Sequence, residues 1–212
     1  GWISTWNSKC GIASYSKNLI NNFQYLEQIF APFSNELLDA DSDKVTRCWD
    51  LDNLINQDLD ELFRKIIQFN CTSVVIQFNF GFFDCDQLEK LIFELKANNV
   101  KTFVFLHSSI GQNNNQKKSL NAYKKSLLSV SNIFVHSVND LNHLKLIGVD
   151  NNVSIFPHGI LDNESLVIAN QNICNTKEVY ADNWLISTYG FCLPHKGFIE
   201  LIKAINLLRE KG

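Results

Sequence analysis

Five segments of the sequence hold small, polar or imidazole side chains, the kinds that bind polar ligands or transfer protons. Each segment directly follows a stretch that is predicted to form a β-strand. Parallel strands end at a common edge, and ligands of open parallel sheets bind beyond the carboxyl ends of the strands. We therefore expect one polar binding edge, formed by residues 7–12, 79–81, 107–109, 136–137 and 157–159.

The first of these segments, residues 7–12, leads from a strand into a helix. The first amides of a helix carry partial positive charge, and Gly11 lets a ligand come close to the backbone, so the segment could bind a phosphate. From this segment alone, an ordinary turn with Asn7 or Ser8 as the helix N-cap is the favoured interpretation. With Gly11 as its single glycine, the segment is neither a G-x-G-x-x-G fingerprint nor a Walker A loop.

Single residues of this edge have both a chemical and a structural interpretation. Cys10 could be an activated nucleophile, but no histidine is tied to it by spacing, so we favour a small buried residue that shapes the turn. His107 could be a base or a sugar ligand, and a satisfied polar residue at the start of a loop is equally compatible with the sequence. The other histidines are interpreted as structural or as lining residues, and the spacing of the 5 histidines matches no metal site.

A later loop, residues 190–197, also leads from a predicted strand into a predicted helix. Lys196 lies at the start of that helix, where the helix dipole disfavours a cation. A lysine placed there indicates a bound anion such as a phosphate. The structural alternative is a solvated lysine.

These loops need a sheet to position them, and the hydrophobic pattern predicts one. Between most of the predicted strands, apolar residues spaced three and four apart predict amphipathic helices. The alternation, with continuously apolar central strands, predicts an α/β fold in which a parallel sheet has helices on both faces. The predicted strands are residues 2–6, 45–49, 73–78, 101–106, 132–135 and 152–156.

The alternating pattern stops at residue 159 and predicts how the chain is organised. Residues 1–159 form the predicted first domain, and the polar residues 160–183 form a connection. Residues 184–212 hold one further strand and helix, which cannot bury their own faces. We therefore expect residues 184–212 to be the incomplete start of a second domain, and the chain to be a fragment.

Composition sets the class of protein. The 212 residues are 45% hydrophobic and 19% charged, which is typical of a globular chain. A net charge of -3 gives no electrostatic footprint for nucleic acid. The 6 cysteines include no C-x-x-C pair, so we expect neither a zinc site nor a thioredoxin-type motif, and we expect reduced, intracellular thiols. No apolar run approaches the roughly 20 residues of a membrane span.

Three motifs resemble those of the retaining GT-B glycosyltransferases of the large family four. Residues 10–20 (CGIASYSKNLI) are similar to the glycine loop and first helix of that family. Residues 154–160 (SIFPHGI) resemble the segment that ends its first domain. Residues 190–204 (GFCLPHKGFIELIKA) resemble the opening of its second domain. The order and spacing of the three motifs agree with the family over nearly the whole chain.

The resemblance implies two Rossmann-like domains that face each other across a cleft, the first mainly for the acceptor and the second for a nucleotide-sugar donor. Transfer would retain the anomeric configuration without a metal or cofactor. By position, Gly11 and Lys196 would bind the donor diphosphate, and His107 would be the catalytic-site residue that contacts the donor sugar. The residues that would line the cleft are Asn7, Cys10, Asn79, Ser108, His158, Gly159 and Gly190.

The implied function is hexosyl transfer to a glycan or lipid-linked acceptor in cytoplasmic polysaccharide or cell-envelope biosynthesis, with peripheral membrane contact. Phe191 stands where the family has arginine, and His158 stands where it has asparagine. The family's Glu-x7-Glu motif would lie beyond Gly212, so we expect the chain by itself to be inactive. The alternatives are a non-catalytic nucleotide-sugar or glycan-binding relative and a sugar-nucleotide epimerase of the same fold.

Overall fold

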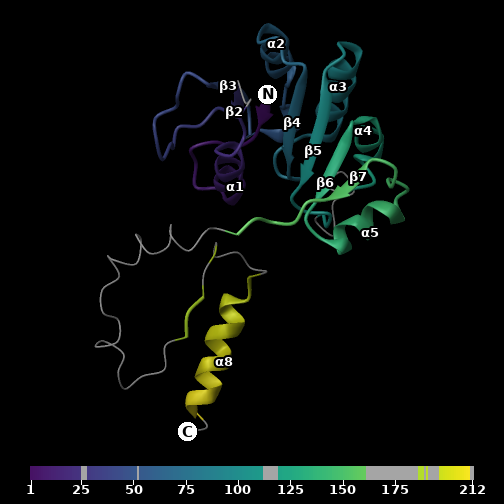
Figure 1. Ribbon diagram of the computed structural model, residues 1–212. Coiled ribbons are helices and arrows are strands. Elements are labelled where there is room, and N and C mark those ends of the chain that lie inside the picture. Colours follow the sequence, from purple (N-terminus) through teal and green to yellow (C-terminus); the bar gives the residue numbers. More distant parts are fainter. Residues whose placement is uncertain are drawn as a thin grey trace. The chain divides into compact units, whose positions relative to one another are not determined.

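The computed structural model describes residues 1–24, 28–51, 53–111, 119–160, 186–188, 190 and 196–210 (Figure 1). The chain divides into two compact units, Gly1–Gly159 and Ile160–Gly212. The first unit is a parallel sheet flanked by helices, which confirms the predicted α/β, Rossmann-like class. Nearly all of the predicted connection, residues 160–183, lies outside the described residues.

Seven strands of the described residues form one sheet in the order β3-β2-β1-β4-β5-β6-β7, and all neighbouring strands are parallel. The chain proceeds outward in one direction from β1 and in the other from β4, so the topological switch point lies between these two strands. The strands are β1 (Trp2–Ile3), β2 (Ile29–Pro32), β3 (Val45–Trp49), β4 (Ser73–Phe78), β5 (Lys101–Leu106), β6 (Asn132–Val135) and β7 (Val153–Ile155).

Helices cover both faces of the sheet. On one face, the larger apolar cluster includes buried side chains from α2 (Asp60–Gln68), α3 (Cys85–Ala97), α4 (Lys124–Ser129) and α5 (Val138–Leu146). On the other face, α1 (Gly11–Ile20) packs on a smaller cluster around Trp2 and Phe105. A short 3-10 helix, η1 (Leu54–Asn56), precedes α2.

Strand β5 shows why the central strands are apolar at successive positions. Val104 and Leu106 belong to the larger cluster, whereas Phe105 belongs to the smaller one. Successive side chains of a strand point to opposite faces of the sheet. Because both faces are covered, both sets of side chains are buried, and the period-two alternation of a half-exposed strand is absent from β5.

Several elements of the first unit differ from the sequence prediction. The sequence does not predict β2, because Pro32 lacks the amide hydrogen that a strand uses. The strand tolerates it because Pro32 is its last residue, where the pairing with β3 shifts register. Strand β1 ends at Ile3 and not at residue 6, and β7 covers Val153–Ile155 and not residues 152–156. The apolar pattern predicts a helix from Leu120 onward, but α4 begins at Lys124 because residues 120–123 form turns.

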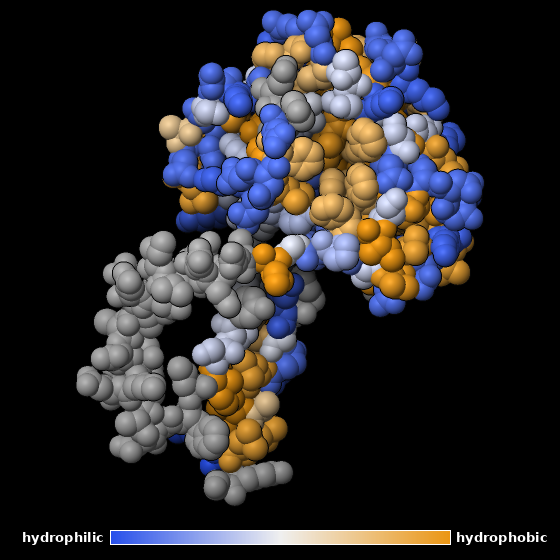
Figure 2. All heavy atoms as spheres, in the orientation of Figure 1, coloured by the Kyte–Doolittle hydropathy of each residue, from blue (hydrophilic) through white to orange (hydrophobic). Residues whose placement is uncertain are grey.

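In the second unit, α8 (Phe198–Glu210) forms where the apolar pattern predicts a helix. Residues 186–188, from the predicted strand at 184–189, adopt no strand structure, because no described strand pairs with them. Several apolar side chains of α8 are exposed, among them Ile202 and Leu208, and Figure 2 shows the apolar surface of this helix. Among the described residues, no helix combines the length and apolar character needed to cross a membrane.

Candidate functional site

The carboxyl ends of β1, β4, β5, β6 and β7 follow one another along one edge of the sheet (Figure 1). The five predicted polar segments leave the sheet at these ends. The parallel pairing therefore brings residues 7–12, 79–81, 107–109, 136–137 and 157–159 to the same edge of the first unit. In sheets of this topology, this is the edge at which ligands bind.

Three histidines and one tyrosine of this edge form what we call the imidazole cluster: His107, His136, His158 and Tyr15. The rings of His136 and His158 stack with their centroids 3.8 Å apart, and the ring of His107 lies 5.2 Å from that of His136. Tyr15 meets all three imidazoles edge-on, at centroid distances of 5.0, 5.4 and 5.4 Å. The cluster thus packs α1 against the ends of β5, β6 and β7.

Burial keeps two of these imidazoles neutral. Burial, followed by the proximity of His136 and His158, lowers the pKa of His107 to about 3. Burial also lowers the pKa of His136, although a hydrogen bond with the Phe156 carbonyl acts in the opposite direction. Burial raises the pKa of Tyr15 to about 12. Near pH 7, the cluster therefore presents a neutral phenol and neutral His107 and His136 side chains.

Hydrogen bonds assign the protons of the cluster and leave several polar atoms without partners. His136 Nδ1 lies 2.8 Å from the Phe156 carbonyl oxygen, which only accepts, so Nδ1 carries the hydrogen and Nε2 a lone pair. His107 Nε2 donates to Gln77 Oε1 at 2.6 Å, which leaves Nδ1 as an acceptor. The Tyr15 hydroxyl, His136 Nε2 and Gln77 Nε2 are buried without a hydrogen-bond partner among the described residues. Buried polar groups of this kind are rare, and these belong to or adjoin the cluster.

The start of α1 is open. Cys10 is its N-cap residue but makes no side-chain capping hydrogen bond, and the first turn holds no acidic residue. Gly11 is exposed, and a Cβ atom placed on it would meet no atom within 4 Å. The expected N-cap at Asn7 or Ser8 is wrong, because the Asn7 amide instead donates to Asp41 Oδ1 at 2.9 Å. The amides at the start of α1 are therefore available to a ligand.

The other predicted cleft residues of the first unit shape this edge. Asn79 Oδ1 accepts a hydrogen bond from the amide two residues ahead at 2.9 Å. The Ser108 hydroxyl donates to the carbonyl two residues ahead at 3.0 Å. Cys10 Sγ accepts a hydrogen bond from Thr5 Oγ1 at 3.4 Å. Gly159 is exposed, with open space around it.

Gly190 and Lys196 belong to the second unit. Gly190 has a φ of 120° with open space beside it, and Lys196 is exposed just before α8. Gly197 has a φ of 73°, a backbone conformation that favours glycine at this turn into the helix. Phe191, which stands where the family has arginine, and His195, which the sequence analysis interprets as structural, lie outside the described residues.

Three residues of the cluster region are not predicted as individual site residues: Tyr15, Gln77 and His136, although His136 lies in a segment of the predicted polar edge. The sequence carried a signal for each of them. His136 follows β6 as His107 follows β5, and the register of these strands places the two positions side by side. Tyr15 lies about one helical turn after Gly11, and Gln77 is a polar residue between apolar neighbours inside β4.

A second polar group, Ser109 with Asp140 and His143, has the composition of a catalytic triad but a different arrangement. Ser109 Oγ donates to Asp140 Oδ1 at 2.5 Å and lies 2.8 Å from His143 Nδ1. In a catalytic triad the carboxylate orients the imidazole, whereas here it contacts the serine. Ser109 is only 7% exposed, and the Ser137 hydroxyl also donates to Asp140. The group therefore anchors the loop after β5 to the start of α5.

Comparison with known proteins identifies no relative of this chain. No family model matches the chain, and neither a curated protein nor a solved structure matches it. Among the described residues, no group of three or more His, Cys, Asp or Glu side chains is placed to hold a metal ion. The site is therefore defined by its own geometry, a largely neutral imidazole cluster packed on a helix whose start is open.

Proposed function

We propose that this chain is part of a retaining GT-B-type glycosyltransferase, and that the edge of its first unit binds the sugar and diphosphate of a nucleotide-sugar donor. The reaction would transfer a hexose to a glycan or lipid-linked acceptor in cytoplasmic polysaccharide or cell-envelope biosynthesis. One observation carries the proposal: the imidazole cluster, with its unpartnered polar atoms, packs on the helix whose N-terminus is open. The three sequence motifs support the same function.

The chemistry of the imidazole cluster suits hydroxyl groups. His107 Nδ1 and His136 Nε2 can each accept a hydrogen bond, and the Tyr15 hydroxyl can donate one. Because His107 and His136 are neutral, they add little attraction for a phosphate. A sugar ring supplies several hydroxyls that both donate and accept. We therefore assign the sugar of the donor to the cluster, with His107 as its first contact.

The open start of α1 suits the diphosphate. Its amides point along the helix axis with partial positive charge, and Gly11 leaves room for close approach. In glycosyl transfer, negative charge develops on the leaving phosphate oxygen, and fixed dipoles aimed at that oxygen lower the barrier. By its place in the third motif, Lys196 would also bind the donor diphosphate.

A second candidate function is binding of a nucleotide-sugar or glycan without transfer. Phe191 favours it, because the family's arginine at this place supplies half of the cationic clamp on the diphosphate. The two functions differ in one product. Transfer releases a nucleoside diphosphate from the nucleotide-sugar, whereas binding leaves the donor intact, so product release measured in the presence of glycan acceptors separates them.

The test of the diphosphate site replaces Gly11. Pyrophosphate and UDP-glucose are titrated into the 15N-labelled chain, and the backbone amides of residues 11–13 are followed by NMR. We expect saturable shifts of these amides in the parent chain. Gly11→Asp should weaken binding by about tenfold or more. A carboxylate at this position repels the phosphate, and the phosphate then loses more than one charge-assisted hydrogen bond to the helix amides.

A loss of binding in Gly11→Asp would not be due to misfolding. An acidic residue in the first turn of a helix is favourable, and the space beside Gly11 admits a side chain, so Gly11→Asp should keep the fold. Gly11→Ala serves as the control that adds size without charge. Equal affinity of the parent and Gly11→Asp for pyrophosphate would contradict the proposal, as would shifts that avoid residues 11–13.

A further inference from the structure

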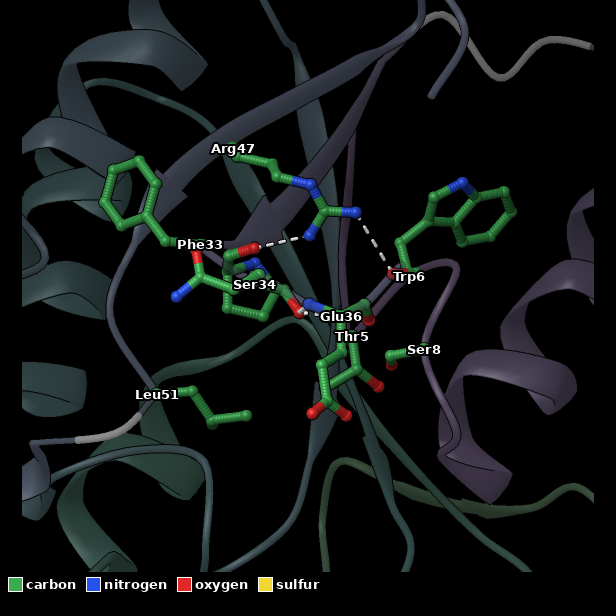
Figure 3. A pocket seen from close by; sticks show the side chains of 10 residues that line it. Thr5, Trp6, Ser8, Phe33, Ser34, Glu36, Arg47 and Leu51 are labelled. Carbon is green, nitrogen blue, oxygen red and sulfur yellow. Dashed lines mark hydrogen bonds between the residues drawn. The ribbon is translucent and has the colours of Figure 1, made fainter. Parts of the chain in front are cut away.

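A separate pocket of about 370 Å³ opens beyond the carboxyl ends of β1, β2 and β3 (Figure 3). Its size is that of a small-molecule site. The lining comes from the loop after β1, from the segment that follows β2, and from β3 with the residues after it. Polar lining predominates, so a ligand here would be recognised by hydrogen bonds.

The cation of the pocket, Arg47, is already neutralised. Its Nε and one terminal nitrogen donate to the two carboxylate oxygens of Asp41, at 2.7 and 3.1 Å. Its terminal nitrogens also donate to the carbonyls of Pro32 and Trp6, at 2.6 and 3.2 Å, as Figure 3 shows. Four hydrogen bonds thus hold the guanidinium in the wall of the pocket. Arg47 organises the pocket and has little positive charge left for a ligand.

Two other polar groups of the pocket, the Glu36 carboxylate and the Ser8 hydroxyl, are available to bind a ligand. The Glu36 carboxylate makes no ion pair with any residue that the structure describes. The Ser8 hydroxyl is buried and has no hydrogen-bond partner there. Figure 3 shows both side chains, with that of Thr5, on the same side of the pocket, across from Leu51. A carboxylate accepts hydrogen bonds and a hydroxyl both donates and accepts, so the pocket is rich in acceptors.

An adjoining pocket extends this surface. It has a volume of about 670 Å³ and shares Ser8, Ser34, Asn35 and Glu36 with the first pocket. Its own lining adds Lys9, together with two leucines. Among the described residues, the charged groups along both pockets are therefore one carboxylate, one lysine and the Arg47–Asp41 pair, and their charges balance. A surface of this kind favours an uncharged ligand that carries many hydroxyls.

We propose that this pocket is a second binding site, specific for an uncharged polyhydroxylated ring such as a neutral sugar. Glu36 accepts hydrogen bonds from two neighbouring hydroxyls of the ring, and Ser8 uses its buried hydroxyl on a third. A phosphate or carboxylate on the ligand is disfavoured in the first pocket, because it would approach Glu36 while Arg47 is occupied by Asp41 and Lys9 lines only the adjoining pocket. The site uses none of the residues of the imidazole cluster, and it does not depend on the proposed transferase function.

The experiment titrates three matched probes into the 15N-labelled chain: methyl α-glucopyranoside, glucose 6-phosphate and glucuronate. NMR follows the amides of residues 8 and 34–36. We expect saturable shifts with the neutral glucoside and about tenfold weaker binding of both anions, as for a lost hydrogen bond to a charged group. Anions that bind as tightly as the glucoside would overturn the proposal, and so would the absence of saturable shifts with the glucoside.

Two variants test the assigned groups. Glu36→Gln should weaken glucoside binding and remove the discrimination against glucose 6-phosphate, whereas Glu94→Gln on α3 should change neither. Ser8→Ala removes a buried hydroxyl that has no hydrogen-bond partner among the described residues, so it should leave the denaturation midpoint unchanged or raise it while glucoside affinity falls. A Ser8→Ala chain with parental glucoside affinity would refute the role of Ser8, and an intact preference in Glu36→Gln would refute that of Glu36.

Discussion

At the scale of single residues, the protonation of His107 is the property that most constrains the site. A strand end next to two other imidazoles is an unfavourable place for an imidazolium. The Nε2 hydrogen is committed to Gln77, so the neutral ring is fixed in one tautomer with Nδ1 as the acceptor. As a neutral acceptor, His107 is better suited to bind a hydroxyl than to balance the charge of a phosphate.

Stability should therefore depend on pH through His107. Its folded-state pKa of about 3 lies below the usual value of 6.5. Above pH 6.5 the ring is neutral in both states. As the pH falls from 6.5 toward 3, the His107 imidazole binds a proton in the unfolded chain but not in the folded chain, so the free energy of unfolding decreases. At pH 5 this loss from His107 amounts to about 2 kcal/mol.

Urea denaturation of the parent and of His107→Gln at pH 7.5 and pH 5 measures this effect. Between the two pH values, the free energy of unfolding should fall less in the variant than in the parent, and the difference should equal the contribution of the His107 imidazole. NMR titration of the His107 ring gives an independent reading, and it should remain neutral at pH 5. A ring that titrates near pH 6.5 would contradict the assignment.

At the scale of elements, the helices of the first unit are capped unequally. In α3, Asp84 accepts hydrogen bonds from the amides of Asp86 and Gln87 at 3.0 and 3.2 Å. In α5, the Ser137 hydroxyl accepts from the amide of Asp140. The start of α1 has no such side chain. An N-terminus without a cap is less stable by roughly 1 kcal/mol, and it remains available to an anion.

Cys10→Ser should therefore stabilise the protein. The serine would occupy an N-cap position whose backbone, with φ -139° and ψ 130°, already suits capping. We expect the free energy of unfolding to rise by about 0.5–1 kcal/mol in urea denaturation. Asp84→Ala is the matched control and should lower it by about 1 kcal/mol. A Cys10→Ser chain that is less stable than its parent would show that the thiol fills a packing role that a hydroxyl cannot.

At the scale of the whole molecule, the first unit holds everything that a folded domain requires. It contains both apolar clusters and the seven described strands. The central strand β4 pairs with β5 over six residues and buries side chains on both faces. In the second unit, by contrast, α8 has no buried residue among those described.

A chain shortened to residues 1–159 should consequently fold by itself. Circular dichroism should show a mixed helix and strand spectrum, and urea should unfold the shortened chain in one cooperative transition, as expected of a single domain of this size. The full chain is the comparison. A shortened chain that melts without a cooperative transition would show that the two apolar clusters are insufficient for an ordered domain.

The sequence by itself determined the fold class, the bounds of β3, β4, β5 and β6, and the edge at which polar residues gather. Hydrophobic periodicity depends on which faces of a segment are buried, and the continuous apolar stretches of β4 and β5 indicate strands that are buried on both faces. It did not determine β2, which is four residues long and ends in a proline, or the order of the strands, because pairing is a property of distant segments.

Only the tertiary structure decided which polar residues become a site. The pairing of β5 with β6 placed His107 beside His136, and the packing of α1 on the sheet brought Tyr15 to both. The same packing buried hydrogen-bonding atoms of Tyr15 and His136 that have no partner in the described part of the chain, and it placed Arg47 in an ion pair with Asp41. Residue type and spacing tell what a side chain can do, whereas burial and neighbours, which arise from contacts distant in sequence, set its charge and its availability.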